Sequence, residues 1–309
     1  MSILKKNSIF SIFSLKNWFN REYNDKKRII FSLSLGLLLS FSHNSVAAYT
    51  VRAPQDILQD VSQTDYSEIY SFDPKTVSFE DRGKNYSWGF KREQGKAPYI
   101  TDDILQLFSE NDAFYLGNEA EKVLYLTFDE GYENGFTAPI LDTLKQHNVP
   151  AAFFITGSYF NKEKELIKRM LDEGHVVGNH TLSHPSMPKV LDDNKLKNEI
   201  TFLSDKFKEE FGVDMKFIRP PMGEFSRRTL KISKELGYKT VFWSSAYVDW
   251  NVKDQPDRDY AFKAVTDQFH NGSVILLHAV SSTNSEILGD VIAEAKRLGF
   301  EFKSLNDLL

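Results

Sequence analysis

Short apolar runs alternate with amphipathic stretches from Val123 to the end of the chain. Seven of the runs have the length and composition of buried strands: VLYLTF, AAFFIT, HVVGNH, KFIRPP, TVFWSS, SVILLH and FEFKSL. Six helical stretches separate them, and four of these end on a glycine that suits a helix C-terminus: Gly174, Gly212, Gly237 and Gly299. Because the runs are apolar on both faces, the pattern predicts an α/β domain with a mainly parallel sheet.

Seven strand units between residues 120 and 309 favour a single-domain β/α barrel, one unit short of the usual eight. An open doubly wound sheet is the alternative architecture, although the glycine-rich turn that often follows its first strand is absent from this sequence. Residues 49–119 show no sustained period, so we interpret them as an accessory N-terminal extension. Within it, TDDILQLF is expected to form a short helix that starts at a Thr101 cap.

Residues 1–48 have the organisation of an export signal. Lysines and an arginine at 26–28 precede an apolar run, Ile29 to Phe41, and the small-residue stretch SVAA ends at Ala48. This pattern predicts cleavage after Ala48. An uncleaved membrane anchor is the alternative, because the basic region before the apolar run is long; in both cases the basic flank stays cytoplasmic. We therefore expect an exported protein that touches the membrane only through this segment.

The composition argues against one class of protein and excludes several kinds of site. The net charge of −5 argues against a nucleic-acid binder, which would carry a basic surface. The chain has no cysteine, so a disulfide, a thiolate ligand and a thiol nucleophile are all excluded. Any metal must therefore be held by histidine and carboxylate side chains.

Residues with catalytic potential cluster at the predicted strand ends, where parallel α/β folds place their chemistry. The first strand ends in FDEG, the third in NHTLSHP, the fourth in RPPMG and the sixth in LLH, and VDW follows the fifth. His180 and His184 are four residues apart and can converge on one cation, with a third ligand from Asp129 or Glu130. Such a site leaves a position for an activated water.

The remaining strand-end residues suit the other roles of metal-assisted hydrolysis. One carboxylate can take the proton of water as general base, and Arg219 can pair with it and keep it ionised. His278 can protonate the leaving group, while Asp249 can orient the His278 ring and favour its charged form.

The ordered motifs TFDEG, HTLSH, RPPMG, VDW and LLH resemble the polysaccharide deacetylase family, also called carbohydrate esterase family 4 or the NodB-homology domain. The resemblance covers about residues 120–309. It implies a distorted (β/α)7 barrel that removes acetyl groups from N-acetylated sugars with a divalent metal, zinc first, with cobalt or manganese as alternatives. It also implies a role for each matching position: Asp129 as base, His180 and His184 as metal ligands, His278 as acid, Arg219 and Asp249 as their respective partners, the Met222 backbone N–H as oxyanion donor, and Tyr132 and Trp250 as substrate contacts.

One position departs from the family pattern. The usual motif is TFDDG, whose second Asp binds the metal, whereas this chain has Glu130. Its carboxylate is kept, but the extra methylene moves the oxygens.

Two further segments, GYENG and FWSSAYVDW, are similar to the sporulation de-N-acetylases that make muramic δ-lactam in spore-cortex peptidoglycan. This resemblance implies an enzyme that acts on N-acetylmuramic acid whose peptide has been removed. We also expect a monomer, located at the cell wall or forespore envelope. An N-acetylglucosamine deacetylase on peptidoglycan or chitin-like oligomers and a catalytically weak wall-binding protein are the alternatives. A barrel glycosidase is disfavoured, because Asp129 and Glu130 are adjacent and would point to opposite faces of a strand.

Overall fold

The computed structural model describes residues 84–309. The predicted export segment and residues 49–83 lie outside the described residues. Within the described part of the chain, no helix is both long enough and apolar enough to span a membrane.

A parallel sheet forms the centre of the domain, and all seven predicted strands belong to it. They are β3 (Val123–Glu130), β4 (Ala151–Ile155), β5 (Val176–Asn179), β6 (Phe217–Ile218), β8 (Lys239–Val241), β10 (Ser273–His278) and β11 (Glu301–Phe302). Two further strands that the sequence pattern did not predict extend the edges: β2 (Ala113–Phe114) and β9 (Ser245–Ala246). The strand order is β2-β8-β6-β5-β4-β3-β10-β9, with β11 paired to β3.

The sheet curls into an incomplete barrel. A bridge between Leu116 and Ser273 brings the chain just after β2 next to the start of β10, so the two ends of the sheet approach each other. This confirms the predicted distorted (β/α)7 barrel over the open doubly wound sheet.

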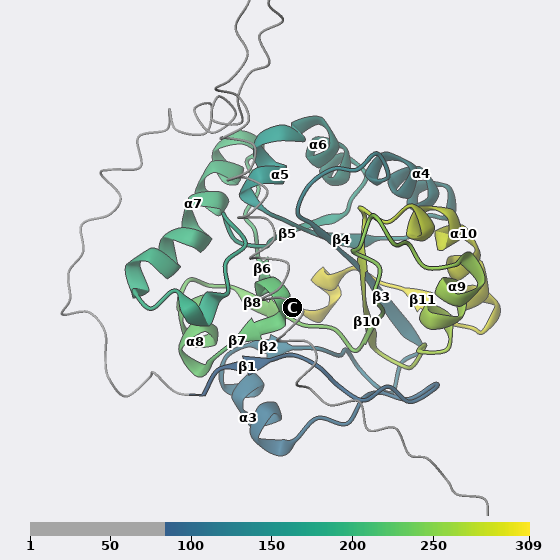
Figure 1. Cartoon of the computed structure of the whole chain (residues 1–309), viewed down its shortest axis with the longest axis horizontal. Coiled ribbons are helices and arrows are strands. Elements are labelled where there is room, and N and C mark those ends of the chain that lie inside the picture. The colour runs from purple at the N-terminus through teal and green to yellow at the C-terminus, as the bar shows by residue number, and fades with distance from the viewer. Residues whose placement is uncertain (1–83) are drawn as a thin grey trace, which may run out of the picture. The chain divides into compact units, whose positions relative to one another are not determined.

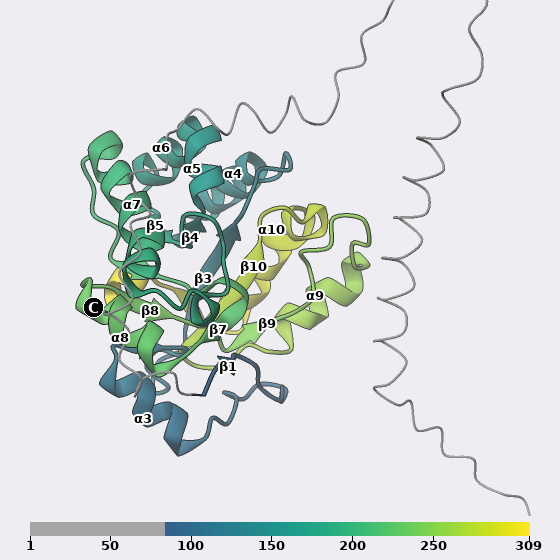
Figure 2. The same cartoon turned by 60° about the vertical axis from the view of Figure 1, so that its left-hand side comes forward.

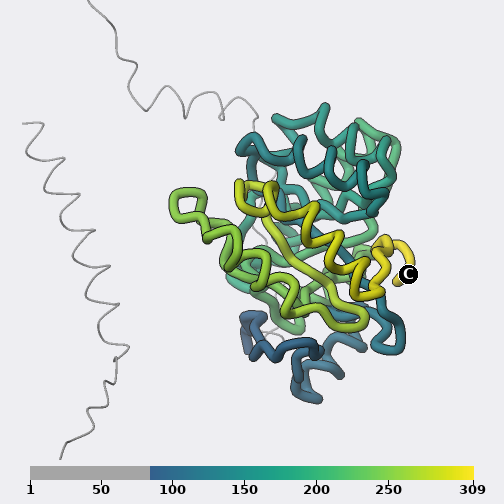
Figure 3. Tube along the Cα trace, turned by 90° about the vertical axis from the view of Figure 1, so that its right-hand side faces the viewer, coloured from purple at the N-terminus to yellow at the C-terminus, as the bar shows by residue number. Residues whose placement is uncertain are grey.

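Helices fill the six connections between the predicted strands and surround the sheet (Figure 1). They are α4 (Thr137–His147), α5 (Gly157–Lys162), α6 (Lys164–Asp172), α7 (Asp193–Phe211), α8 (Arg227–Glu235), α9 (Arg258–Thr266) and α10 (Ser282–Arg297). The last two, α9 and α10, pack against each other (Figure 3), and α9 also contacts β9. The four predicted C-terminal glycines all have positive φ, between 70° and 84°, which confirms their role in ending helices.

Side-chain alternation along β3 separates two apolar layers. Leu126 and Phe128 face the helices, whereas Tyr125 faces the barrel interior. By the same alternation, Asp129 belongs to the interior face and Glu130 to the helix-facing side. The two acids at the end of this strand therefore enter different environments.

The described part of the N-terminal extension is integrated with the barrel. Strand β1 (Tyr86–Ser87) pairs antiparallel with β7 (Glu224–Phe225), and β2 joins the main sheet beside β8. Helix α3 (Asp102–Glu110) starts after Thr101 as predicted and lies near β1 (Figure 2). Trp88 follows β1 and packs against Phe108 and Phe242 in a separate aromatic cluster.

Candidate active site

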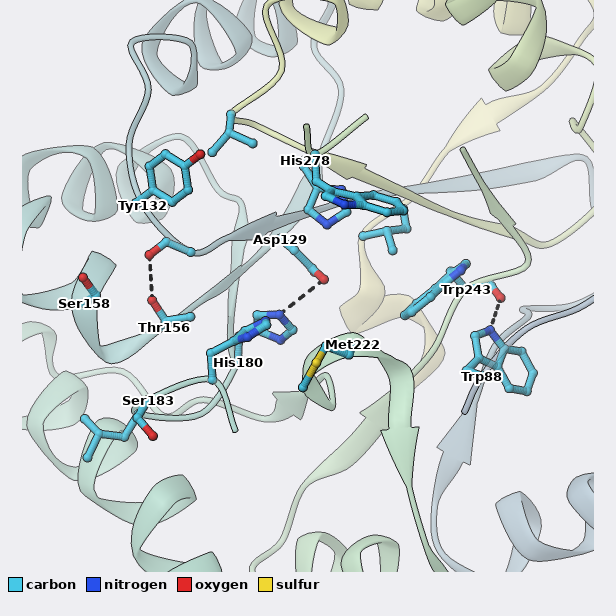
Figure 4. Close-up of a pocket in the computed structure, with 16 residues that line it drawn as sticks. Trp88, Asp129, Tyr132, Thr156, Ser158, His180, Ser183, Met222, Trp243 and His278 are labelled. Carbon is cyan, nitrogen blue, oxygen red and sulfur yellow. Dashed lines mark hydrogen bonds and ion pairs between the residues drawn. The ribbon is translucent and has the colours of Figure 1, made fainter. Parts of the chain in front are cut away.

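A pocket of about 730 Å³ opens at the carboxyl ends of the strands. Arg219 and Asp249 lie behind its wall, each bonded to a residue that lines it. Glu130 does not line the pocket. The other predicted site residues all do: Asp129, Tyr132, His180, His184, Met222, Trp250 and His278. Figure 4 shows Asp129, His180 and His278 converging on its centre.

Asp129 and Arg219 form a buried ion pair. The Arg219 Nη1 donates to Asp129 Oδ1 at 2.8 Å, and the side chains are 0% and 9% exposed. Burial alone would raise the pKa of Asp129, but the neighbouring His180, Arg219 and His278 outweigh it and lower that pKa below its usual value. Asp129 is therefore ionised at neutral pH and can accept a proton.

Arg219 is held rigidly by the strands around it. Its Nη2 donates to the Thr127 hydroxyl at 2.9 Å and its Nε donates to the Val241 carbonyl at 3.1 Å. The guanidinium also stacks over the Phe154 ring, 4.2 Å from the centroid. These contacts fix the position of the Asp129 carboxylate.

His180 and His184 come together because the chain between them turns sharply. Thr181 and His184 both have left-handed backbone conformations, with φ of 67° and 58°. The Asn179 side chain accepts from the Thr181 N–H, and the Thr181 hydroxyl accepts from the His184 N–H. This turn places the two imidazole rings 4.8 Å apart, edge to face.

His180 presents a lone pair to the pocket. Its Nδ1 lies 2.8 Å from the Arg219 carbonyl, which only accepts, so Nδ1 carries the proton. Burial lowers the pKa of His180 to about 4, so the ring is neutral at pH 7. Its Nε2 therefore faces Asp129 Oδ2 across 3.5 Å with no proton between two acceptors.

A divalent cation could bind the free lone pair on His180 Nε2, and a hydrogen bond from Nδ1 to a backbone carbonyl is the arrangement that metal-bound histidines usually have. Within residues 84–309, however, no cluster of three or more His, Cys, Asp or Glu side chains is arranged as a metal site. The donor set fits a cation held by two imidazoles, His180 and His184, with other positions open to water or substrate.

Glu130 lies on the other side of β3. Its carboxyl is fully buried, 3.5 Å from the Thr137 hydroxyl, and Oε1 has no hydrogen-bond partner among the described residues. Burial, with the charges of Glu133 and Asp129 adding to it, raises the pKa of Glu130 well above its usual value. A protonated carboxyl outside the pocket is a poor ligand, so this geometry gives no support to the predicted metal role of Glu130.

His278 and Asp249 form the second pair of the site. His278 Nδ1 lies 2.7 Å from Asp249 Oδ1, and Asp249 Oδ2 accepts from the His278 backbone N–H at 2.8 Å. Burial would lower the pKa of His278, but the Asp249 charge and hydrogen bond outweigh it and raise that pKa. The ring can therefore carry a proton on Nε2, which faces the pocket.

The loop that carries Met222 depends on the N-terminal extension. Met222 has φ of 58°, and the following Gly223 also lies in the left-handed region. The Trp88 N–H donates to the Gly223 carbonyl at 2.8 Å, and the Trp88 indole N–H donates to the Trp243 carbonyl at 2.9 Å. A Cβ on Gly223 would lie 2.9 Å from Trp88, so only glycine fits under this contact.

Trp88 and Trp243 are pocket residues that sequence reasoning missed. Trp88 belongs to SWGF, a segment without period, and no pattern links it to a loop more than a hundred residues away. The two tryptophans lie on one side of the pocket, opposite Tyr132, Thr156 and Ser158 (Figure 4).

Tyr132 and Trp250, the predicted substrate contacts, are exposed aromatic residues at the pocket. They are 49% and 54% exposed. The Trp250 ring lies 5.7 Å from the His278 ring, edge to face. Exposed aromatic faces beside a polar centre suit the apolar faces of sugar rings.

Comparisons with known proteins agree with this geometry. The model of the polysaccharide deacetylase family matches residues 117–241. Peptidoglycan-N-acetylmuramic acid deacetylase PdaA of Bacillus subtilis is 44% identical over 225 residues, which cover 72% of this chain and 85% of that protein. A structure of B. subtilis PdaA, a family 4 carbohydrate esterase, has a TM-score of 0.70 at 43% identity, covering 73% of this chain and 97% of the other. A peptidoglycan-N-acetylglucosamine deacetylase of Bacillus cereus is 38% identical over 192 residues, 61% of this chain and 68% of that protein. The chain belongs to the polysaccharide deacetylase family.

Proposed function

We propose that this chain hydrolyses the acetamide of N-acetylmuramic acid in peptidoglycan glycan strands from which the peptide has been removed. One observation carries the proposal: the Asp129–Arg219 pair, the two imidazoles and the His278–Asp249 pair meet in one pocket. The similarity to PdaA supports muramic acid as the substrate sugar.

Asp129 is the proposed general base. It takes a proton from the attacking water, whose oxygen forms a bond to the acetyl carbonyl carbon. Arg219 keeps this carboxylate ionised and holds it in place until the proton arrives. The backbone N–H of Met222, which lines the pocket, is the proposed donor to the oxygen that becomes negative.

His278 is the proposed general acid. Its Nε2 proton passes to the sugar nitrogen as the C–N bond breaks, which releases acetate and a free amine. Asp249 accepts from the opposite ring nitrogen and so favours the charged ring before the transfer. Tyr132 and Trp250 are proposed to stack against the sugar rings at the pocket opening.

A divalent metal is part of the proposal, with zinc first and cobalt or manganese as alternatives. When bound by His180 and His184, it would polarise the acetyl carbonyl and make the attacking water more acidic. The neutral state of His180 at pH 7 supports this role, because a metal ligand must offer a free lone pair.

The place of action follows from the substrate. A peptidoglycan deacetylase works outside the cytoplasmic membrane, so we propose a monomer at the cell wall or forespore envelope, where its product would lead to muramic δ-lactam in spore cortex. Residues 1–48 would direct export, by cleavage after Ala48 or as an anchor.

The test uses peptide-free glycan strands and the metal-loaded protein. We expect acetate release, with deacetylated or lactam muramic acid in the muropeptides by mass spectrometry, and no release by folded Asp129→Asn. Glucosamine as the sole deacetylated sugar would replace the muramic assignment by the activity named for the B. cereus relative. No acetate with zinc, cobalt or manganese would favour the wall-binding alternative.

A further inference from the structure

We propose that Asn284, together with Tyr247, is a positioning residue that holds Asp249 against the His278 ring. The proposal deepens the function above and rests on the role of His278 in it. Neither residue lines the pocket. Tyr247 lies in the FWSSAYVDW segment but was given no role there, and Asn284 lies in none of the motifs.

Asn284 lies in the first turn of α10, directly behind Asp249. Its Nδ2 donates to Asp249 Oδ2 at 2.6 Å and to the His278 backbone carbonyl at 3.1 Å. A single side-chain amide therefore contacts both members of the proposed acid pair. Asn284 and Asp249 are each 1% exposed, so water does not replace these bonds readily.

The orientation of the Asn284 amide is determined by its partners. A carboxylate and a backbone carbonyl only accept, so the atom that faces them must be the nitrogen. The Asn284 oxygen consequently faces the Tyr247 hydroxyl, which must donate to it. Burial, followed by the charge of Asp249, raises the pKa of Tyr247, so the hydroxyl keeps the proton that it donates.

Asp249 thus accepts three hydrogen bonds in one fixed geometry. Two come from the ring and backbone of His278, and the third from Asn284. Within the described part of the chain, no Lys or Arg pairs with Asp249, so the neutral Asn284 amide orients the Asp249 carboxylate. Tyr247 donates to Asn284 and Asn284 donates to Asp249, while His278 donates to Asp249 from the pocket side, so the donors from both sides meet at the Asp249 carboxylate.

The loop that carries Asp249 has a second tie to α10. Gln255 Nε2 donates to the carbonyls of Asp249 and Asn251, while its Oε1 accepts from the Ser281 hydroxyl. Gln255 fixes the backbone of the loop, and Asn284 fixes the carboxylate itself. Loss of the Asn284 amide should therefore change the proton affinity of His278 without unfolding the loop.

Other charged groups also act on His278 and must stay constant in a test. Asp129 and Arg219 affect it from the barrel interior, and His184 is coupled to it. The variants below change none of these groups. They remove only the donors behind Asp249.

The experiment is an NMR titration of the His278 ring in the full-length protein, assigned by comparison with His278→Gln. Asn284→Leu keeps the side-chain shape but lacks the amide, and Tyr247→Phe removes only the hydroxyl. We expect the pKa of His278 to fall by about one unit in Asn284→Leu and by less in Tyr247→Phe. Without the amide that holds it, the Asp249 carboxylate moves away from the ring, so its hydrogen bond to the charged form of His278 is weakened. In deacetylation assays, the basic limb of kcat should move to lower pH by the same amount, with KM changed less than about twofold.

Asn111→Leu is the matched control. Asn111 is also a buried asparagine whose Nδ2 donates to a backbone carbonyl, that of Leu107, but it lies at the end of α3. This variant should leave the His278 titration at its wild-type position. An unchanged His278 pKa in folded Asn284→Leu and Tyr247→Phe would overturn the proposal, and Tyr247→Phe alone decides if Asn284→Leu does not fold. The NMR readout needs no substrate, so a shift without deacetylation would refute the proposed function and leave this inference standing.

Discussion

Replacing Arg219 by methionine tests the buried ion pair at the centre of the site. Methionine retains much of the packing against Phe154 but leaves the Asp129 carboxylate without its guanidinium. Removing one partner of a buried pair typically costs about 3–5 kcal/mol of unfolding free energy, because the remaining charge stays desolvated. With exposures of 0% and 9%, this pair belongs to that class. We expect Arg219→Met to lose about 3–5 kcal/mol at pH 7.

The pH dependence gives the sign of the effect. The pKa of Asp129 is lower in the folded protein than its usual value, so its stabilisation is present above the unfolded pKa of about 3.9 and is lost as pH falls through the folded pKa. Without Arg219 the folded pKa rises. The difference in stability between wild type and Arg219→Met should therefore be largest near pH 7 and should shrink towards acid pH. The acid limb of the activity profile should move to higher pH.

Urea unfolding with a chelator present measures these differences without a contribution from metal binding. In a double-mutant cycle with Asp129→Asn, Arg219→Met should lower the unfolding free energy by less when the Asp129 carboxylate is absent than when it is present. Arg228→Met is the control. Arg228 pairs with Asp193, which is more exposed than Asp129, so this variant should lose less unfolding free energy than Arg219→Met. Equal losses from Arg219→Met with and without the Asp129 carboxylate would refute the reasoning.

Three further predictions follow from the same geometry. His184→Ala should weaken zinc binding about tenfold or more in calorimetry, whereas Glu130→Gln should change it less than about twofold; a large loss in Glu130→Gln would contradict the outward orientation of that side chain. Asp249→Asn should lower the pKa of His278, so activity should decline at a lower pH than in wild type; an unshifted basic limb in the rate profile would disprove the pairing. Trp88→Ala should lower the unfolding free energy by about 3–5 kcal/mol, because a large aromatic leaves a packed cluster; calorimetric melting at the wild-type temperature would show that the extension does not stabilise the barrel.

The strands and the placement of the site at their ends could be predicted from the sequence, because buried parallel strands leave a regular pattern of apolar residues. Buried parallel strands require apolar residues on both faces, so all seven runs could be recognised and their carboxyl ends placed at one edge. The pairing of Asp129 with Arg219 and of His278 with Asp249 follows from that shared edge. Contacts between irregular segments carry no periodic signal. For this reason the sequence did not reveal that Trp88 supports the loop of Gly223.

The two acids of FDEG show how far a single backbone register determines chemistry. Asp129 and Glu130 are adjacent and both buried, yet one faces Arg219 and the other faces Thr137 on the helix side. The guanidinium favours the charged form of the first, while burial with nearby acids favours the neutral form of the second. Metal affinity in this chain should therefore depend on the imidazole pair, and the proton transfer on Asp129 alone.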